Sequence, residues 1–292
     1  MGSFCTKFED NGECLDLVSR RNKTIDEMVI PEPECIRLQY LNDFQDKFNI
    51  LKYIQLVDFI NLLNTFRFDE PEETSSHSVK FTDSLLNKDG WIKFINYRIL
   101  ESPIIPNIDS VGMNLQKQFF DDVFDRLLMS YRFFFQTENY YIPKIMVISF
   151  AFNYCGRKIS QNVDIFLNLF CNPEGKIEFT NDVYAFLYCL ITFAFDFPTE
   201  FLTKFTSPEY NKNYFNVKSS SEWELFSKVD ERDSICKQFF QLETRKIFGE
   251  DEKKSYTRDE FKLLLLDTSE NGGTWIIDNG LLRTRMEAGL QA

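Results

Sequence analysis

Oxygen-bearing side chains surround a glycine at residues 170–181 in the spacing of a calcium-binding loop. A twelve-residue loop of this kind needs oxygen ligands at positions 1, 3, 5, 7, 9 and 12, and a glycine at position 6 for the sharp turn. With Gly175 at position 6, Asn172 and Glu174 fall at ligand positions 3 and 5. Position 1 is Phe170 and position 12 is Asn181, so most of the negative charge that the ion requires is missing. We therefore expect the shape of the loop without its metal.

A second segment, residues 85–96, can be aligned in the same way. Gly90 at position 6 places Asn87 at position 3 and Asp89 at position 5. Position 1 is Leu85 and position 12 is Asn96, so this loop lacks the same two carboxylates. It is predicted not to bind calcium.

The third segment, residues 249–260, keeps the last ligand and loses the first. Glu260 falls at position 12 and Asp251 at position 3, but position 1 is Gly249. Lys253 and Lys254 occupy positions 5 and 6, and an ammonium group at a ligand position repels Ca²⁺. We expect no metal in any of the three loops.

Apolar residues around these loops fit the helices that would have to hold them. Around the 170–181 loop, Ile177 and Phe179 fall at positions 8 and 10, and Phe166 and Leu169 precede the loop at helical spacing. Over roughly residues 80–265 the chain resembles the EF-hand superfamily in degenerate form, which implies paired helix–loop–helix units. An unrelated helical domain with glycine-bearing turns is the alternative.

The wider pattern predicts an all-α protein with two helical lobes, the second built of EF-hand-like helix pairs. Few glycines and prolines accompany long stretches of helical apolar periodicity. We expect a flexible arm at 1–35, a first lobe at 36–105, a second lobe at 114–267 and a weakly ordered tail at 268–292. The boundary is placed near 101–113, where two prolines and a glycine occur. The predicted core of the second lobe comprises Phe166, Leu169, Ile177, Phe179, Tyr184, Leu187 and Ile191.

The first residues, MGSFCTK, fit a lipid-anchoring signal. Removal of Met1 would expose Gly2 for myristoylation, with Thr6 completing the motif. One myristoyl chain binds membranes weakly, and Cys5 is placed to carry a palmitoyl group as the second anchor. Acylated calcium sensors of the EF-hand superfamily, and some TLDc-domain proteins with an EF-hand-like half, begin similarly. We expect a peripheral protein on a cytoplasmic membrane face; the alternative is an arm whose motif is coincidental.

Composition argues against several other functions. The net charge is −12 without a long basic block, which disfavours nucleic acid as a partner. Seven cysteines without a CxxC pair indicate reduced thiols, and the single histidine, His77, argues against zinc or a histidine-based triad. No apolar run is long enough to cross a membrane.

A competing resemblance is to Sec7 domains, the all-α exchange modules of Arf GTPases. There a glutamate finger intrudes on the nucleotide phosphate and Mg²⁺, and Glu138 would take that role here. The matching residues are Tyr131, Arg132, Ile142, Ile145 and Met146 around it, and Val183, Tyr184, Tyr188, Ile191 and Asp196 in a second motif. The Pro-Gly before the finger is missing, two residues are inserted, and Ala194 replaces an expected asparagine.

No paired carboxylates, phosphate loop or nucleophile elbow stands out, so a binding protein is favoured over an enzyme. The resemblance to EF-hand proteins implies a calcium-independent regulator or adaptor that needs no cofactor and binds an amphipathic helix in an apolar groove. Because the chain has 32 phenylalanines, we expect some of them to be exposed in that groove in the free protein. In the Sec7 interpretation the partner would instead be a small GTPase.

Overall fold

The protein is mostly helical, as the sequence predicts. The computed structural model describes residues 48–66, 85–156, 158–204, 229–249 and 255–289. The elements in these ranges, in chain order, are η2 (Ile50–Tyr53), α3 (Leu56–Thr65), β1 (Leu85–Leu86), α4 (Lys88–Phe94), η3 (Ile95–Leu100), α5 (Ser110–Phe135), β2 (Ile142–Pro143), α6 (Lys144–Tyr154), α7 (Ile159–Phe170), β3 (Lys176–Glu178), α8 (Asn181–Ile191), η4 (Thr192–Asp196), α9 (Phe197–Lys204), α12 (Val229–Phe248), β4 (Ser255–Thr257), α13 (Arg258–Leu266), η5 (Thr274–Ile276) and α14 (Asn279–Gly289).

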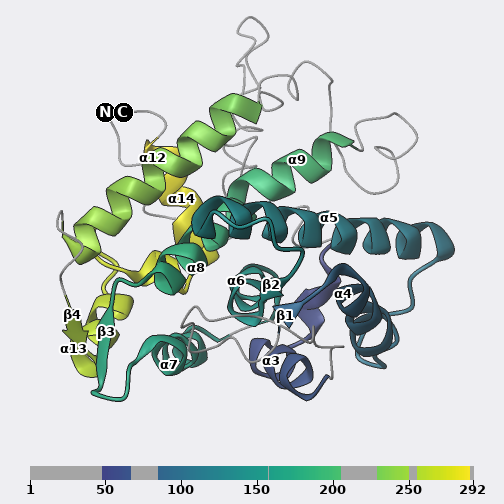
Figure 1. The fold of residues 1–292 in the computed structure, drawn as a ribbon, viewed down its shortest axis with the longest axis horizontal. Coiled ribbons are helices and arrows are strands. Elements are labelled where there is room, and N and C mark those ends of the chain that lie inside the picture. Colours follow the sequence, from purple (N-terminus) through teal and green to yellow (C-terminus); the bar gives the residue numbers. More distant parts are fainter. Residues whose placement is uncertain (1–47, 67–84, 157, 205–228, 250–254, 290–292) are drawn as a thin grey trace, which may run out of the picture.

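Two short antiparallel ladders organise the helices (Figure 1). In the first, β1 pairs with β2, with Leu86 opposite Ile142. In the second, β3 pairs with β4, with Ile177 opposite Tyr256. Each strand lies just before a helix, so the described ranges contain four strand–helix units joined in two pairs: β1–α4 with β2–α6, and β3–α8 with β4–α13.

Side-chain caps begin several of these helices. The Asn87 side chain accepts a hydrogen bond from the Gly90 amide at the start of α4, and Asp109 accepts one from Gly112 at the start of α5. Thr180 caps α8 through the amide of Val183. Such caps satisfy amides that have no partner inside the helix, so these polar residues fix where each helix begins.

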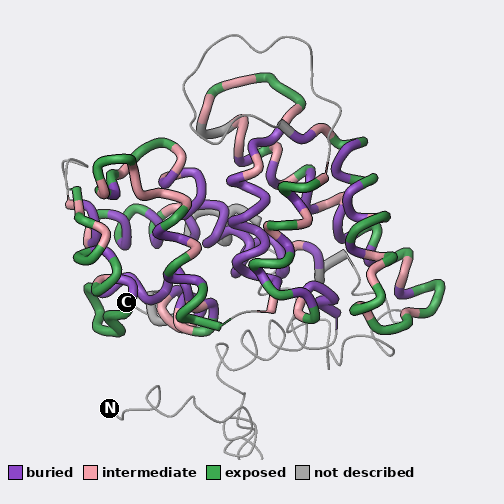
Figure 2. Tube along the Cα trace, turned by 90° about the horizontal axis from the view of Figure 1, so that it is seen from below, coloured by how far each residue is buried: buried purple, intermediate pink, exposed green. Residues whose placement is uncertain are grey.

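One continuous hydrophobic core connects the two pairs (Figure 2). Phe119 of α5 lies near its centre, with ring centroids 5.5 Å from Tyr154 of α6 and 5.2 Å from Phe201 of α9. Of the predicted core residues, four are buried and three are partly buried against the core. The buried ones are Phe166, Ile177, Leu187 and Ile191, and the partly buried ones are Leu169, Phe179 and Tyr184.

The lobe boundary predicted at 101–113 does not separate two packing units. The β1–β2 ladder joins residues 85–86 to residues 142–143, so the first pair of units extends across that boundary. The prolines there lie in a turn between η3 and α5, and the glycine, Gly112, lies in the first turn of α5; a turn divides domains only where few contacts cross it. The first pair therefore includes elements from both sides of the predicted boundary.

None of the helices in the described ranges is long and apolar enough to span a membrane.

Candidate functional site

The loops 170–181 and 249–260 meet at equivalent positions of the twelve-residue alignment. Ile177 is at position 8 of the first loop, and counting from Gly249 as position 1 puts Tyr256 at position 8 of the second. These two residues are directly opposite in the β3–β4 ladder. On the other side, Phe166 before one loop stacks on Phe261 after the other, with ring centroids 5.6 Å apart. The two loops therefore form one compact end of the second pair.

Hydrogen bonds within the chain hold the 170–181 loop in its turn. The Asn172 side-chain oxygen accepts from the amides of Glu174 at 3.0 Å and Lys176 at 2.9 Å. Gly175 has φ 77°, a left-handed conformation that suits glycine at the predicted turn position. The atom that would ligate calcium at position 3 is thus engaged with the backbone.

The two terminal ligand positions of this loop carry no carboxylate that could replace it. Phe170 at position 1 packs on Phe166 and Phe186, with centroids 4.7 and 5.1 Å apart. Asn181 at position 12 is the first residue of α8. In the described parts of the chain no cluster of three or more His, Cys, Asp or Glu residues is arranged to hold a metal ion. Glu174 lies exposed, 3.9 Å from the Lys176 ammonium.

The acidic residue at position 12 of the second loop, Glu260, serves as part of a helix cap. Glu260 and Thr257 form a reciprocal capping box at the start of α13. The backbone and side-chain hydrogen bonds from Thr257 lower the pKa of the Glu260 carboxyl, because they favour its charged form. Gly249 is left-handed with φ 85°, and Asp251 lies outside the described residues.

The register predicted for residues 85–96 is wrong. Gly90 lies inside α4 and is buried, so it makes no sharp turn. Asn87 caps that helix and Asp89 belongs to its first turn. Residues 67–84, which precede β1, lie outside those described.

The sequence left open whether a diverged unit lies near residues 133–146, between the two glycine-bearing loops, and the structure has a strand–helix unit there. After α5 the chain reaches Ile142 and Pro143, which pair with β1, and α6 begins at once. The segment has no glycine at a turn position, so the loop pattern does not locate the unit. The signal in the sequence is Ile142, an apolar residue between the polar segment after α5 and the apolar helix α6.

On the first pair, α9 covers the apolar side of α5. Phe197 and Phe201 of α9 lie 5.5 and 5.2 Å from Phe119, centroid to centroid. Arg126 of α5 holds this helix through ion pairs with Asp196, at 3.0 Å, and with Glu200. Burial alone would lower the pKa of the Arg126 guanidinium, but the two carboxylates outweigh it and the net pKa is raised.

On the second pair, residues 274–289 form what we call the covering segment, η5 together with α14. Trp275 is fully buried, 5.8 Å from Phe239 of α12. Asn162 of α7 donates to the Ile277 carbonyl at 3.0 Å, which fixes the segment against that helix. Leu282 of α14 is also fully buried. An apolar face of the second pair is thus already occupied by a helix of the same chain.

The expectation of exposed phenylalanines is wrong for the described side chains. Every phenylalanine among them is buried or partly buried. Phenylalanine removes a large apolar area from water, and here helical periodicity directs these rings inward. The exposed large apolar residues of the described ranges are of other types, for example Leu263 and Tyr140.

The residues that suggested a Sec7 domain differ in burial: Glu138 is exposed, whereas the apolar residues of the motif that follow it are buried. Glu138 lies exposed in the loop between α5 and β2. Ile142 is in a strand, and Ile145 and Met146 are buried in α6, so these three do not present an apolar surface beside the glutamate. The second set lies on α8 and η4, where its members are buried or, for Tyr184, partly buried.

The lipidation candidates Gly2 and Cys5 lie outside the described residues, as does His77. The membrane anchor expected at Gly2 and Cys5 therefore stays a prediction.

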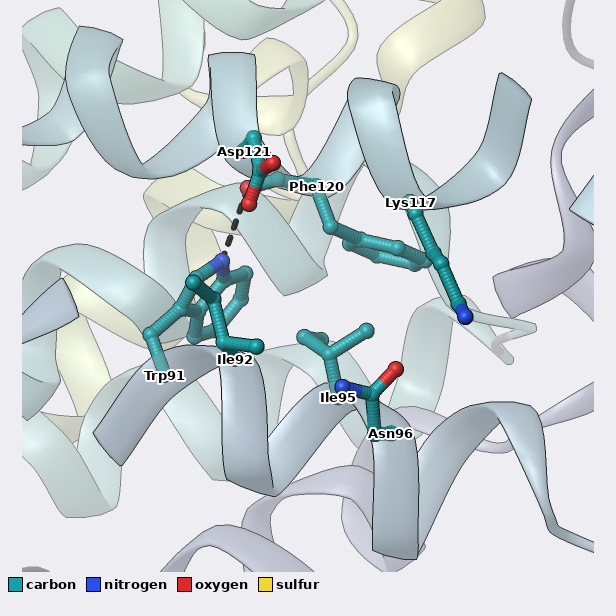
Figure 3. A pocket seen from close by; sticks show the side chains of 7 residues that line it. All are labelled: Trp91, Ile92, Ile95, Asn96, Lys117, Phe120 and Asp121. Carbon is teal, nitrogen blue, oxygen red and sulfur yellow. Dashed lines mark hydrogen bonds between the residues drawn. The ribbon is translucent and has the colours of Figure 1, made fainter. Parts of the chain in front are cut away.

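A hollow of about 110 Å³ lies between α4 and α5 (Figure 3). Trp91 lines it and donates to the Phe120 carbonyl at 2.7 Å. Lys117 and Asp121 supply polar edges, and burial raises the pKa of the Asp121 carboxyl, an effect that Lys88 opposes. The hollow is smaller than the ~300–1,000 Å³ typical of ligand sites. The loops and covered faces are therefore the stronger candidates.

Comparisons with known proteins returned no match of any kind. No family model, no curated protein and no solved structure is similar to this chain at the significance required.

Proposed function

We propose that the protein is a calcium-independent regulator or adaptor of EF-hand-like build that binds an amphipathic helix of a protein partner. The observation that carries the proposal is the pairing of Ile177 with Tyr256. Each is position 8 of its loop, so two segments aligned independently from the sequence meet at equivalent positions. Paired helix–loop–helix units would produce this equivalence, which is why it supports the proposal.

Independence from calcium is supported by the bonds that replace the metal. Asn172 closes the first loop through two backbone amides, and Glu260 caps α13. In a calcium sensor the ion organises the loop and thereby sets the angle between its helices. Here internal hydrogen bonds set that geometry, so the helix pair is held without an ion.

Helix binding is supported by the covering segment. The second pair packs one face against α14, which lies against α12 and η4 and has Leu282 and Met286 buried. Helix-in-groove recognition uses a face of this kind, with apolar anchors spaced three or four residues apart on the ligand. We therefore propose that a partner contributes an amphipathic helix of the same kind as α14, which this face already binds.

We also propose that Gly2 and Cys5 carry acyl groups and place the protein on a cytoplasmic membrane face, with no cofactor and no enzymatic activity of its own. The support is the N-terminal sequence motif. The exchange-factor alternative has less support because the apolar residues that follow Glu138 are buried.

Calorimetry of the purified protein tests the central part of the proposal. Titration with Ca²⁺ should give no binding heat in the range of about 10⁻⁷–10⁻⁵ M where calcium sensors bind. Asn172→Ala is the matched variant, since it removes the side chain that closes the 170–181 loop. A micromolar site in the wild type that this variant abolishes would contradict the proposal and show that the loop is functional.

A further inference from the structure

The free protein lacks an open groove on the second pair, because the covering segment occupies it. We infer that α14 is an internal competitor, which an amphipathic helix from a partner displaces from the face formed by α12 and η4. The inference rests on the proposed function and adds to it how the site is regulated and what chemistry its ligand carries.

The covering segment consists of two parts that are held differently. In η5, Trp275 and Ile276 are buried, and Ile277, which follows directly, is fully buried and bonded to Asn162 through its carbonyl. Residues 277–278 are not helical and separate this anchor from α14. A rotation at these two residues would lift α14 while η5 stays in the core.

The helix α14 itself is weakly determined by its sequence. It has only eleven residues, and Gly280 within its first turn lowers its helical propensity. Its buried apolar contacts among the described side chains are Leu282 and Met286, one turn apart. Short helices are marginal without packing partners, so α14 depends on this face for its structure.

The carboxylate of Glu243 indicates that a ligand helix should carry a cation in addition to its apolar residues. Glu243 of α12 is buried and forms ion pairs with Arg285 of α14 at 3.0 Å and with Lys246 of its own helix at 2.7 Å. When α14 leaves, Lys246 still compensates the carboxylate, so the open face is not left with an isolated buried charge. A competing helix gains most when it offers a cation next to an apolar pair with i, i+4 spacing, as α14 does.

The polar contacts of α14 also suit reversible docking. Arg283 donates to the Ala194 carbonyl at 3.0 Å, and Asn279 donates to the Asn153 carbonyl at 2.8 Å. Both acceptors are backbone carbonyls, Asn153 near the end of α6 and Ala194 within η4. A ligand helix with arginine or asparagine can satisfy them equally well, because backbone acceptors do not select one particular donor.

The α9 cover of the first pair lacks these properties. It continues from α8 through the π-helical turn η4, without a non-helical joint. Arg126 also fixes it through Asp196 and Glu200. Lifting α9 would break a continuous helix and two ion pairs, so the second pair is the face that opens.

The test compares full-length proteins in binding a labelled peptide of residues 278–289. Wild type is compared with the double variant Leu282→Asp/Met286→Asp, in which two carboxylates oppose docking of α14. The control is Leu263→Asp, which adds a carboxylate to a side chain on α13 that is 71% exposed. The double variant should bind the peptide at least tenfold more tightly than wild type, and the control should match wild type. A peptide with the change R285E should bind the double variant at least threefold more weakly.

Hydrogen exchange on the same samples separates the possible failures. Equal peptide binding by wild type and double variant would overturn the inference and leave the proposed function standing. A double variant that exposes α14 to exchange but binds no helix would overturn both. If α14 stays as protected as α12 despite the two aspartates, the helix does not detach and the inference is wrong.

Exchange in the wild type keeps the inference testable if the double variant does not fold. Amides of α14 should then exchange at least tenfold faster than those of α12. Equal protection of the two helices would overturn the inference.

Discussion

Replacing Arg126 with methionine should destabilise the protein strongly, because it leaves two carboxylates without their cation. Asp196 has only 4% of its side chain exposed, and Arg126 has 17%. Breaking a buried ion pair by removing one partner costs about 3–5 kcal/mol, since the remaining charge stays buried and uncompensated. Methionine keeps much of the volume of the arginine stem, so the loss is mainly electrostatic.

The neighbouring residue on α5 supplies a matched control. Asp125 forms an ion pair with Lys88 at 2.9 Å, close to the 3.0 Å of the Arg126–Asp196 pair, but their side chains are 56% and 45% exposed. Exposed pairs contribute about 0–1 kcal/mol because water screens them. Lys88→Met should therefore be nearly neutral. The two ion pairs have similar N–O distances but differ in burial. Comparing the two variants therefore separates the effect of burial on stability from the effect of ion-pair distance.

The stability of both variants is measured by urea unfolding and by thermal unfolding, each followed by circular dichroism. The free energy of unfolding should fall by about 3–5 kcal/mol for Arg126→Met, with a drop in melting temperature of at least about 6 °C. Adding Asp196→Leu to Arg126→Met should recover part of the loss, because it removes the more deeply buried of the two carboxylates. If Arg126→Met and Lys88→Met have the same cost, the ion pair does not fix α9 and the reasoning is refuted.

Three further predictions concern membrane localisation, nucleotide-exchange activity and thiol reactivity. Gly2→Ala should move the protein from the membrane to the soluble fraction of cells, whereas unchanged partitioning would mean that the motif is coincidental or that another anchor exists. Wild type should not stimulate nucleotide exchange on an Arf-type GTPase; exchange that Glu138→Lys abolishes would favour the Sec7 interpretation. Burial raises the pKa of the Cys189 thiol to about 12, so iodoacetamide at mildly alkaline pH should label the half-buried Cys171 well before Cys189 in the native state, as read by peptide mass spectrometry. Equal labelling rates would contradict the burial of Cys189.

Local signals in the sequence identified the loop at 170–181 correctly. Gly175 adopts a positive φ, and Ile177 points into the core from a strand, as its position in the loop requires. Both features depend on residues within a few positions of one another. A glycine required by backbone geometry and one apolar residue in a polar stretch are signals that a single sequence carries.

The same glycine signal failed at Gly90 because helices also use it. Trp91 and Phe94 follow Gly90 at helical spacing and are both fully buried, and Asn87 caps the helix. A glycine close to an N-cap is compatible with α4, so spacing alone could not distinguish a loop from a helix start. The deciding contact, Leu86 opposite Ile142, links residues far apart in the sequence.

The covered faces show a different limit of sequence reasoning. Amphipathic periodicity tells which side of a helix is apolar but not which element will occupy it. The tail from residue 268 was expected to be weakly ordered, yet Trp275 is fully buried and Gly272 permits a close turn back. A Cβ at Gly272 would lie 1.9 Å from the Asp267 carbonyl oxygen, so only glycine fits there. The abundance of phenylalanine could not reveal that the chain supplies its own cover.

The two covers differ in a way that bears on regulation. On the first pair, α9 is continuous with α8 and is fixed by Arg126, so it acts as part of the core. On the second, α14 follows a non-helical joint and shares Glu243 with Lys246, which stays behind when α14 leaves. Under the proposed function, the 170–181 loop is closed by its own hydrogen bonds rather than by an ion. We propose that access to the face is then controlled by competition between helices, which requires a cover that is stable enough to protect the face and weak enough to be displaced.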